Sequence, residues 1–366
     1  MLALLITETA KNEPSRFHLY NNILLKFKNN SYDFEILTFM KDNSKHSKTF
    51  RTLKVKNYSS FKTKYKIINI IIFICYLIKK KPQKVFIGGY GYLEHWVALF
   101  ICKILFIDKI LWTGASSITS ITKSKFIDLL KKFFINQFNV SITYGSNAAK
   151  YLMELGFKKK IFIARNISDV ESFEKFKKIY VNSIDYKKKR SYEYKQFIFS
   201  GRLEKHKGCL ELIKCFKKID KSKYFLHVVG SGSLEKLFIK YFNRKIINGK
   251  FYGKLNQINF AKILIQSDFY IMPTLNDPFT RTLSEALACN TFSINSCYDD
   301  ASNDLIINKN YGLIFNPKRE LDFYKKIKSL IDSGKKRENF IFFKKIFNTE
   351  NYSQKFLNAL QYKPQS

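Results

Sequence analysis

One loop in the second half of the chain combines the residue types that hold a diphosphate. The loop begins and ends with glycine, at Gly201 and Gly208, and follows a short apolar run. The cations between the glycines include Arg202 and Lys207. Glycines let a backbone approach a ligand closely, and cations neutralise a departing diphosphate, so we expect the loop to bind a leaving group. The alternative is an exposed basic loop without a ligand, because the whole chain is basic.

A second segment, residues 273–289, places polar residues around the start of a predicted helix. A turn carries Asp277, and the helix begins near Thr282 with Glu285 in its first turn. The free N–H groups of residues 281–283 would form an anion site at the positive end of the helix dipole. Two ordinary structural roles stay open. Thr282 and Glu285 have the T-x-x-E spacing of a capping box, and Asp277 precedes a proline as turn residues often do.

Two further turns carry glycines at the ends of predicted strands. Gly230 and Gly232 form a Gly-x-Gly turn, but the third glycine of the dinucleotide fingerprint is missing, so NAD binding is not indicated. Gly253 ends the next strand, and the backbone of Lys254 and Leu255 would then lie beside a base.

Parallel strands must bring these loops together. Short apolar runs alternate with amphipathic stretches along the chain, which is typical of parallel α/β units. The predicted strands are residues 2–6, 34–39, 85–87, 110–112, 140–143 and 161–163, then 197–200, 225–229, 247–252, 269–272 and 292–295. In doubly wound sheets ligands bind at the carboxyl ends of the strands, which is where all four loops fall.

The chain has 366 residues, long for one core, so we expect an α/β protein of two doubly wound domains. Residues 1–170 would form the first domain and residues 196–345 the second. The polar, Lys-rich segment 171–195 is the predicted linker. Residues 346–366 would form a C-terminal helix that packs back on the first domain.

The formal charge of +36 indicates an anionic partner, such as nucleic acid, an acidic membrane surface or a phosphorylated substrate. A general bias towards Lys, Ile, Asn, Phe and Tyr explains the charge equally well. Nucleic-acid binding is a competing hypothesis, prompted by this charge and by 36 Phe and 22 Tyr residues. No RRM, KH or zinc-finger signature is present and the aromatics lie largely in apolar runs, so we favour no nucleic acid as partner.

Cysteine spacing and apolar runs indicate in which cellular compartment the protein is expected. The six cysteines lie far apart without a CxxC pair, which argues against a zinc site or disulfide framework and favours a reducing cytosol. Residues 1–6 are typical of a buried strand and not of a leader. The apolar run 67–78, followed by three lysines at 79–81, is shorter than the roughly 20 residues that span a bilayer. A core-facing helix or an interfacial membrane helix would explain it.

Across residues 197–316, the order and spacing of the loops resemble glycosyltransferase family 4, retaining enzymes of GT-B fold. The family's element of a strand followed by Gly-Arg-Leu and then Lys-Gly is similar to residues 201–208, and its Gly-x-Gly turn to residues 230–232. Its E-x7-E element is similar to residues 277–285, with Asp in place of the first acid. The resemblance implies two Rossmann-like domains facing across a cleft, an acceptor-side domain first and a nucleotide-sugar domain second.

The resemblance also implies roles for individual residues. Arg202 and Lys207 would hold the diphosphate, Glu285 the ribose hydroxyls and Asp277 the hydroxyls of the donor sugar. The residues whose amides would bind phosphate or sugar, next to Phe279, are Thr280, Arg281, Thr282 and Leu283. Family members generally act without a bound metal, so no cofactor is expected.

Three departures from the family pattern concern the acceptor side and the donor sugar. Residues 7–16 contain none of the glycines usual in the first loop. No histidine follows the strand 110–112, and the nearest one, His95, is expected to be a surface or core residue. Thr280 and Asn290 replace glycines, and the Thr280 side chain would crowd the sugar if the backbone ran unchanged.

The sequence therefore predicts retaining transfer of a sugar from a nucleotide diphosphate sugar to a glycan or polyprenyl-diphosphate-linked acceptor. The expected setting is surface polysaccharide biosynthesis (capsule, O-antigen or lipopolysaccharide). The expected location is the cytoplasm or the inner face of the cytoplasmic membrane, with anionic lipid as a partner. A sugar-nucleotide epimerase of the same fold is an alternative, and Asp277 and Thr280 leave an inactive partner subunit open. The sugar, the base, the acceptor and the oligomeric state stay undetermined.

Overall fold

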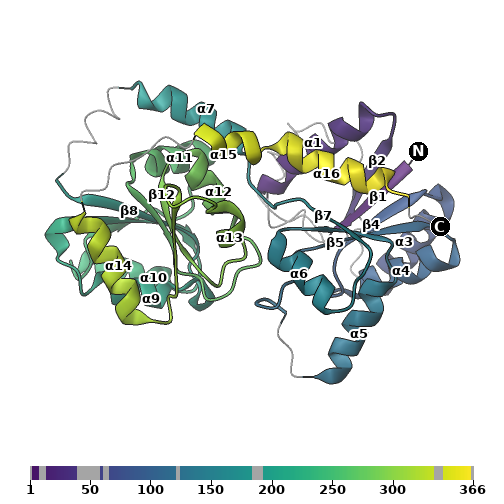
Figure 1. The fold of residues 1–366 in the computed structure, drawn as a ribbon, viewed down its shortest axis with the longest axis horizontal. Helices are drawn as coiled ribbons and strands as arrows, with labels where there is room; N and C mark the ends of the chain where they lie inside the picture. Colours follow the sequence, from purple (N-terminus) through teal and green to yellow (C-terminus); the bar gives the residue numbers. More distant parts are fainter. Residues whose placement is uncertain are drawn as a thin grey trace. The chain divides into compact units, whose positions relative to one another are not determined.

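The computed structural model describes residues 2–7, 14–38, 58–60, 66–120, 124–183, 193–333 and 341–363. The chain forms two compact units (Figure 1). The first combines Met1–Asn166 with Thr349–Ser366, and the second is Ile167–Asn348. The second unit is therefore inserted into the first, and the chain passes between them twice.

The first unit is built on a seven-stranded sheet in the order β3-β2-β1-β4-β5-β6-β7, with every neighbouring pair parallel. Its strands are β1 (Leu2–Thr7), β2 (Asp33–Thr38), β3 (Tyr58–Ser60), β4 (Lys84–Ile87), β5 (Asp108–Thr113), β6 (Val140–Thr143) and β7 (Lys160–Ile163). The helices described in this unit are α1 (Pro14–Lys28), α3 (Lys66–Lys80), α4 (Leu93–Ile104), α5 (Lys125–Asn136), α6 (Ser146–Glu154) and α16 (Thr349–Gln361).

Two cores cover the two faces of this sheet, because successive strand side chains point in opposite directions. Phe86 of β4 faces the core formed with α1 and α16, and its ring lies 5.7 Å from that of Phe356. Its neighbours Val85 and Ile87 face the second core, formed with α3, α4, α5 and α6. The expected core-facing helix at residues 67–78 is α3, which buries Phe73 in that core.

Helix α16 completes the first unit from the far end of the sequence. It packs along α1, and Lys26 of α1 forms an ion pair with Glu350. Beyond the helix, the Lys84 ammonium donates to the Tyr362 carbonyl at 2.9 Å. One face of the first sheet is thus covered by helices from both ends of the chain.

The second unit is built on a six-stranded parallel sheet in the order β10-β9-β8-β11-β12-β13. Its strands are β8 (Lys195–Arg202), β9 (Tyr224–Ser231), β10 (Gly249–Phe251), β11 (Phe269–Met272), β12 (Phe292–Ser296) and β13 (Gly312–Phe315). The α-helices described here are α7 (Val170–Val181), α9 (Cys209–Phe216), α10 (Glu235–Asn243), α11 (Gln257–Gln266), α12 (Arg281–Ala288), α13 (Ala301–Leu305), α14 (Glu320–Asp332) and α15 (Ile341–Ile346). Helices α7, α11 and α12 pack against one another and α9 packs on α14, with the sheet between the two groups (Figure 1).

The segment expected to be a linker, residues 171–195, begins with a helix instead. Helix α7 is capped by Asp169, whose carboxylate accepts from the Ser172 N–H at 3.0 Å. Its Phe173 is buried, with the ring 6.1 Å from that of Phe260 in α11. Lys175, Lys177 and Lys178 lie on this helix, which packs in the second unit, while residues 184–192 fall outside the described part.

Candidate functional site

The strand order of the second sheet has a topological switch point between β8 and β11. These strands are neighbours, yet the chain first builds outwards through β9 and β10 and then crosses to β11, β12 and β13. Doubly wound sheets bind ligands at the carboxyl ends of the strands at such a switch point. The loop after β8 carries Lys207, and the loop after β11 carries Asp277.

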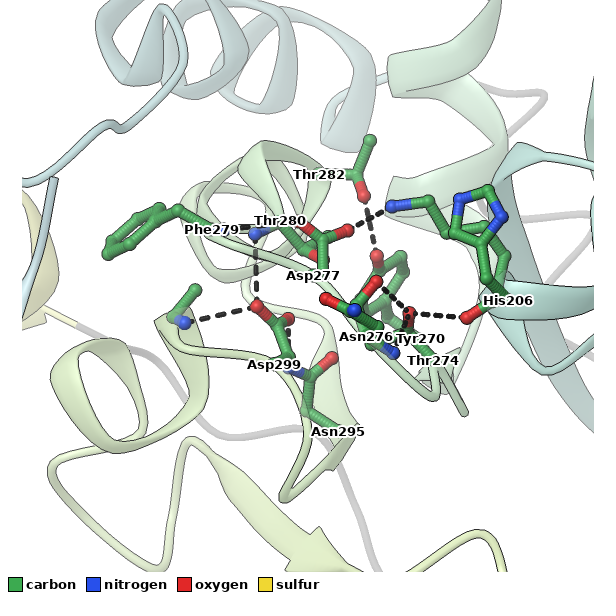
Figure 2. Close-up of polar contacts among 12 residues, drawn as sticks. His206, Tyr270, Thr274, Asn276, Asp277, Phe279, Thr280, Thr282, Asn295 and Asp299 are labelled. Atoms are coloured by element: carbon green, nitrogen blue, oxygen red, sulfur yellow. Dashed lines mark hydrogen bonds and ion pairs between the residues drawn. The ribbon is translucent and has the colours of Figure 1, made fainter. Parts of the chain in front are cut away.

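Gly208 allows the loops after β8 and β11 to touch. Its φ of 72° lies in the left-handed region, and a Cβ at this position would be 1.8 Å from the Pro273 carbonyl oxygen. The neighbouring His206 carbonyl accepts the Leu275 N–H at 2.8 Å and the Thr274 hydroxyl at 3.0 Å (Figure 2). The two loops are therefore clamped together by their backbones.

The glycines after β8 and β9 are required by close backbone contact. Gly201 and Gly230 are register partners, and a Cβ on Gly230 would be 1.9 Å from the Gly201 carbonyl oxygen. The φ of Gly230 is 135°, outside the range that side chains adopt readily. A Cβ on Gly232 would be 2.6 Å from the Leu203 carbonyl oxygen. The Gly-x-Gly turn thus serves the packing of two strand ends.

Lys207 and Asp277 form an ion pair that joins the two clamped loops (Figure 2). Only 12% of the Lys207 side chain and 8% of the Asp277 side chain are exposed. The other carboxylate oxygen of Asp277 accepts the Phe279 N–H at 3.1 Å. The sequence assigned these two residues separately, to the diphosphate and to the donor sugar, whereas the structure pairs them.

Asp299, which the sequence did not single out, organises the start of α12. Its buried carboxylate accepts the Thr280 N–H and the Ala301 N–H, each at 3.0 Å, and the Asn295 side-chain N–H at 2.6 Å (Figure 2). Burial, reinforced by the nearby Asp277 carboxylate, raises the pKa of Asp299 to about 7. The Thr280 amide, which was expected to bind phosphate or sugar, thus donates to Asp299 in this structure.

Glu285 is bonded across the second unit and does not form a capping box. Its Oε1 accepts from the Ser168 hydroxyl at 2.5 Å, while the Ser168 N–H donates to the Ser284 hydroxyl at 2.9 Å. Helix α12 has Thr280 as N-cap, with no side-chain capping bond. Burial raises the pKa of Glu285, and the Ser168 bond opposes that shift. The structure thus leaves Glu285 as a buried carboxylate at the switch point.

The first turn of α12 keeps part of the expected anion site. The amides of Thr282 and Leu283 are at the second and third helical positions, where no carbonyl of the helix is available to accept them. The Thr282 hydroxyl lies 2.5 Å from the hydroxyl of Tyr270, which is buried under the helix. The Thr280 hydroxyl oxygen is also buried and has no hydrogen-bond partner among the described residues.

Arg202 differs from Lys207 in its surroundings. It ends β8 with an exposed side chain, and no ion pair joins it to an acid in the described part of the chain. The nearby His206 has a pKa lowered by burial first and by the charges of Lys207 and Arg202 second. Arg202 is therefore exposed and without an ion pair among the described residues, whereas Lys207 is buried and paired with Asp277.

The predicted donor-site residues fall into two groups. The clamped loops bring together the first group, which comprises Gly201, Arg202, Lys207, Asp277, Phe279, Thr280, Arg281, Thr282, Leu283 and Glu285. Gly230 adjoins them through its contact with Gly201. Lys254 and Leu255 follow β10, two strands away from β8, and Lys254 is exposed.

Thr280 and Asn290, which stand where the family has glycine, differ in backbone conformation. Thr280 has a φ of −69°, so its backbone needs no glycine. Asn290 has a φ of 59°, in the left-handed region, which Asn tolerates better than most residues. Its side-chain oxygen accepts from the Lys177 ammonium at 3.0 Å. A helix-ending glycine is therefore replaced by a residue that adopts the same backbone conformation.

In the first unit, His95 is a core residue. It is 1% exposed, and its Nδ1 lies 2.6 Å from the Gly89 carbonyl oxygen. Burial lowers its pKa. The first loop, residues 8–13, lies outside the described residues. Among the described residues, no group of three His, Cys, Asp or Glu could hold a metal ion, and no helix is long and apolar enough to span a membrane.

Comparisons with known proteins agree with this geometry. Residues 182–345 match the family model described as Glycosyl transferases group 1. No curated protein sequence matches the chain. Solved structures are similar over 98% of this chain. The lipopolysaccharide outer core galactosyltransferase WaaB, in its apo form, has 18% identity and a TM-score of 0.75, and the match covers 99% of the WaaB chain.

Two further structures have the same arrangement. HepE from Anabaena, in complex with UDP and glucose, has 12% identity and a TM-score of 0.75, with 98% of this chain and 99% of its own covered. A glycosyltransferase from Rickettsia africae has 14% identity and a TM-score of 0.68, and the match covers 98% of this chain and 93% of the Rickettsia chain. The predicted GT-B fold is confirmed, and the match to Glycosyl transferases group 1 lies within the second unit.

Proposed function

We propose that this protein is a retaining, family 4 glycosyltransferase that moves a sugar, such as a hexose, from a nucleotide diphosphate donor to a glycan or lipid-linked glycan. The observation that carries the proposal is the buried pair of Lys207 and Asp277, which joins the two clamped loops at the switch point of the second sheet. The match of residues 182–345 to Glycosyl transferases group 1 supports it independently.

The proposed chemistry depends on charge at the leaving diphosphate. Arg202, which is exposed and forms no ion pair among the described residues, would bind the diphosphate first. The diphosphate would then compete with Asp277 for the Lys207 ammonium. Asp277 released in this way would accept a hydroxyl of the donor sugar. Two cations would take the place of a metal ion, so we propose that transfer is metal-independent.

The proposed donor contacts around α12 follow from its unused polar groups. The amides of Thr282 and Leu283 would bind a phosphate at the positive end of the helix. A sugar hydroxyl would satisfy the buried Thr280 hydroxyl, and Glu285 Oε2 would accept from the ribose. HepE is seen with UDP and with UDP-glucose, which supports a nucleotide sugar as the donor here.

The proposed setting is surface polysaccharide biosynthesis at the inner face of the cytoplasmic membrane. The name of WaaB, a lipopolysaccharide outer core galactosyltransferase, supports this setting. The formal charge of +36 supports an anionic lipid surface as a partner, where a polyprenyl-diphosphate-linked acceptor would lie.

Ligand-dependent stability tests the donor first. Purified protein is heated with uridine, guanosine, adenosine or thymidine diphosphate, and one of them should stabilise it by about 2.7 kcal/mol at a hundred times its Kd. The matching labelled nucleotide sugar should then transfer its sugar to a glycan acceptor with the anomeric configuration retained, also in EDTA. Stabilisation by none of the diphosphates, or donor epimerised without an acceptor, would overturn the proposal.

A further inference from the structure

Helix α5 in the first unit is apolar on two faces, and the described residues cover only one of them. Phe134 lies on the covered face and is fully buried. On the other face Phe126 is 68% exposed, Leu129 63%, Leu130 38% and Phe133 44%. These four residues recur at i, i+3, i+4 and i+7, so they form one stripe along the helix. Among the described residues, nothing buries this second apolar stripe of α5.

Helix α4 continues this apolar surface. Its exposed residues Leu93, Phe100 and Ile104 are 65%, 47% and 69% exposed. Trp96 joins the two helices, because its ring stacks on Phe133 at 6.5 Å with an interplanar angle of 6° and lies 6.4 Å from that of Phe100. The α4–α5 surface consists of Leu93, Trp96, Phe100, Ile104, Phe126, Leu129, Leu130 and Phe133.

The α4–α5 surface is large enough to be an interaction site. At about 200 Å² for a whole side chain, the exposed fractions of Phe100, Phe126 and Phe133 alone amount to roughly 300 Å². The largest apolar patch of a typical monomer is only about 300–600 Å² and is often functional. The Leu and Ile side chains of the surface enlarge it further.

Charge around this surface selects the kind of partner. Residues 66–138 contain eleven Lys and only three Asp or Glu. Lys103, Lys125 and Lys132 are exposed on α4 and α5, and the one acid of α5, Asp128, pairs with Lys131. A second copy of this chain would set lysines against lysines, which is unfavourable. An apolar stripe with aromatics beside lysines is the pattern of a helix that lies in an anionic membrane interface.

We propose that the α4–α5 surface docks on an anionic lipid bilayer, with its Phe, Leu and Ile side chains among the acyl chains. Lys103, Lys125 and Lys132 contact the headgroup phosphates. The inference rests on the proposed function and deepens it, since it assigns the membrane contact to defined residues. The apolar run 67–78, the candidate that the sequence offered, buries Phe73 and Leu77 in the core and leaves three isoleucines exposed, Ile71, Ile72 and Ile78.

Vesicle binding tests the surface directly. The full chain is sedimented with vesicles of phosphatidylcholine, with and without phosphatidylglycerol. The double variant Phe126→Ser/Leu129→Ser should lower the partition coefficient for the anionic vesicles by about tenfold or more. The control Ile179→Ser/Leu321→Ser removes two side chains of the second unit that are each 65% exposed, and it should bind as the wild type does.

Tryptophan fluorescence adds a readout at the surface itself. The chain has two tryptophans, Trp96 in the α4–α5 surface and Trp112, which is 3% exposed in the core. Anionic vesicles with lipids brominated on the acyl chains should quench the wild type. Trp96→Phe should abolish that quenching, because Trp112 stays out of reach of the lipid.

The outcomes separate this inference from the proposed function. Equal vesicle binding by Phe126→Ser/Leu129→Ser and wild type, or no quenching of Trp96, would overturn the membrane surface. If the wild type is a dimer, and this variant is a monomer that binds vesicles as the wild type does, the α4–α5 surface is a self-association surface and the membrane proposal is overturned. Stabilisation by a nucleotide diphosphate is measured on the same samples, and it reports the donor site independently of lipid.

Discussion

Replacing Asp299 with asparagine should remove a pH dependence from the stability of the second unit. Burial and the neighbouring Asp277 raise the pKa of Asp299 from 3.8 to about 7, so the folded chain holds this proton more tightly than the unfolded chain. The stability supplied by that proton is complete below the unfolded pKa and is lost as the pH rises through the folded pKa. Wild-type protein should therefore lose stability on going from pH 5 to pH 8.

The size of the loss follows from the two pKa values. The difference between the two pKa values corresponds to about 4 kcal/mol in total, of which about 3 kcal/mol falls between pH 5 and pH 8. Asparagine keeps an oxygen that can accept the Thr280 and Ala301 N–H groups, but it does not ionise. The free energy of unfolding should therefore fall with pH by about 3 kcal/mol more in the wild type than in Asp299→Asn.

Urea unfolding between pH 5 and pH 8, followed by far-UV circular dichroism, measures this difference. Tryptophan fluorescence is an internal control, since Trp96 and Trp112 both lie in the first unit and should report the same pH dependence in both proteins. Asp277→Asn should flatten the wild-type curve, because it removes a charge that raises the pKa of Asp299. A constant offset between wild type and Asp299→Asn across this pH range would refute the reasoning.

Three further changes address the loop after β8 and the buried Glu285. Arg202→Ala should lower kcat/KM for sugar transfer about a hundredfold, because one charge-assisted contact to the leaving group is worth about 3 kcal/mol. The control is Lys205→Ala, which removes an exposed cation of the same loop and should have little effect on kcat/KM. Gly208→Ala should cost at least about 2 kcal/mol in urea unfolding, since a Cβ at φ 72° would meet a backbone oxygen. Ser168→Ala should cost about 1–3 kcal/mol in the same assay and raise the pKa of Glu285 further, because a buried carboxylate loses its hydroxyl donor.

Each of these expectations has a result that contradicts it. Near wild-type transfer by Arg202→Ala would remove this residue from the diphosphate site. A Gly208→Ala protein as stable as the wild type would show that the loops separate without cost. Unchanged stability in Ser168→Ala would mean that water or another donor replaces the hydroxyl at Glu285.

Strand positions could be predicted where a central strand is a short apolar run. All residues of β11 are buried and apolar, so this strand shows no alternation, whereas β12 is equally buried but alternates Phe and Ile with Ser and Asn. Composition did not separate α7 from the lysines at 187–189 that follow it, and its buried side, with Val170 and Phe173, faces helices far along the chain. Composition alone does not show which side of such a segment is covered.

The donor loops were predictable, but the pairing of their side chains was not. The partners Lys207 and Asp277 are 70 residues apart, and Ser168 and Glu285 are 117 residues apart, so no local spacing connects them. Asp299 gave one weak signal, since an acid just after a predicted strand lies at the edge where ligands bind. Its bond to the Thr280 amide depends on the tertiary fold.

The position of α16 constrains the order in which the protein can fold. Lys26 in α1 and Glu350 in α16 are separated by 324 residues, yet they belong to one helix pair over one core. During synthesis, the second unit can therefore complete its sheet while this face of the first sheet still lacks Phe356 and Leu360. Contacts this distant in sequence close slowly. The half of the protein that is made first is thus finished last, and its exposed core would need protection until α16 emerges.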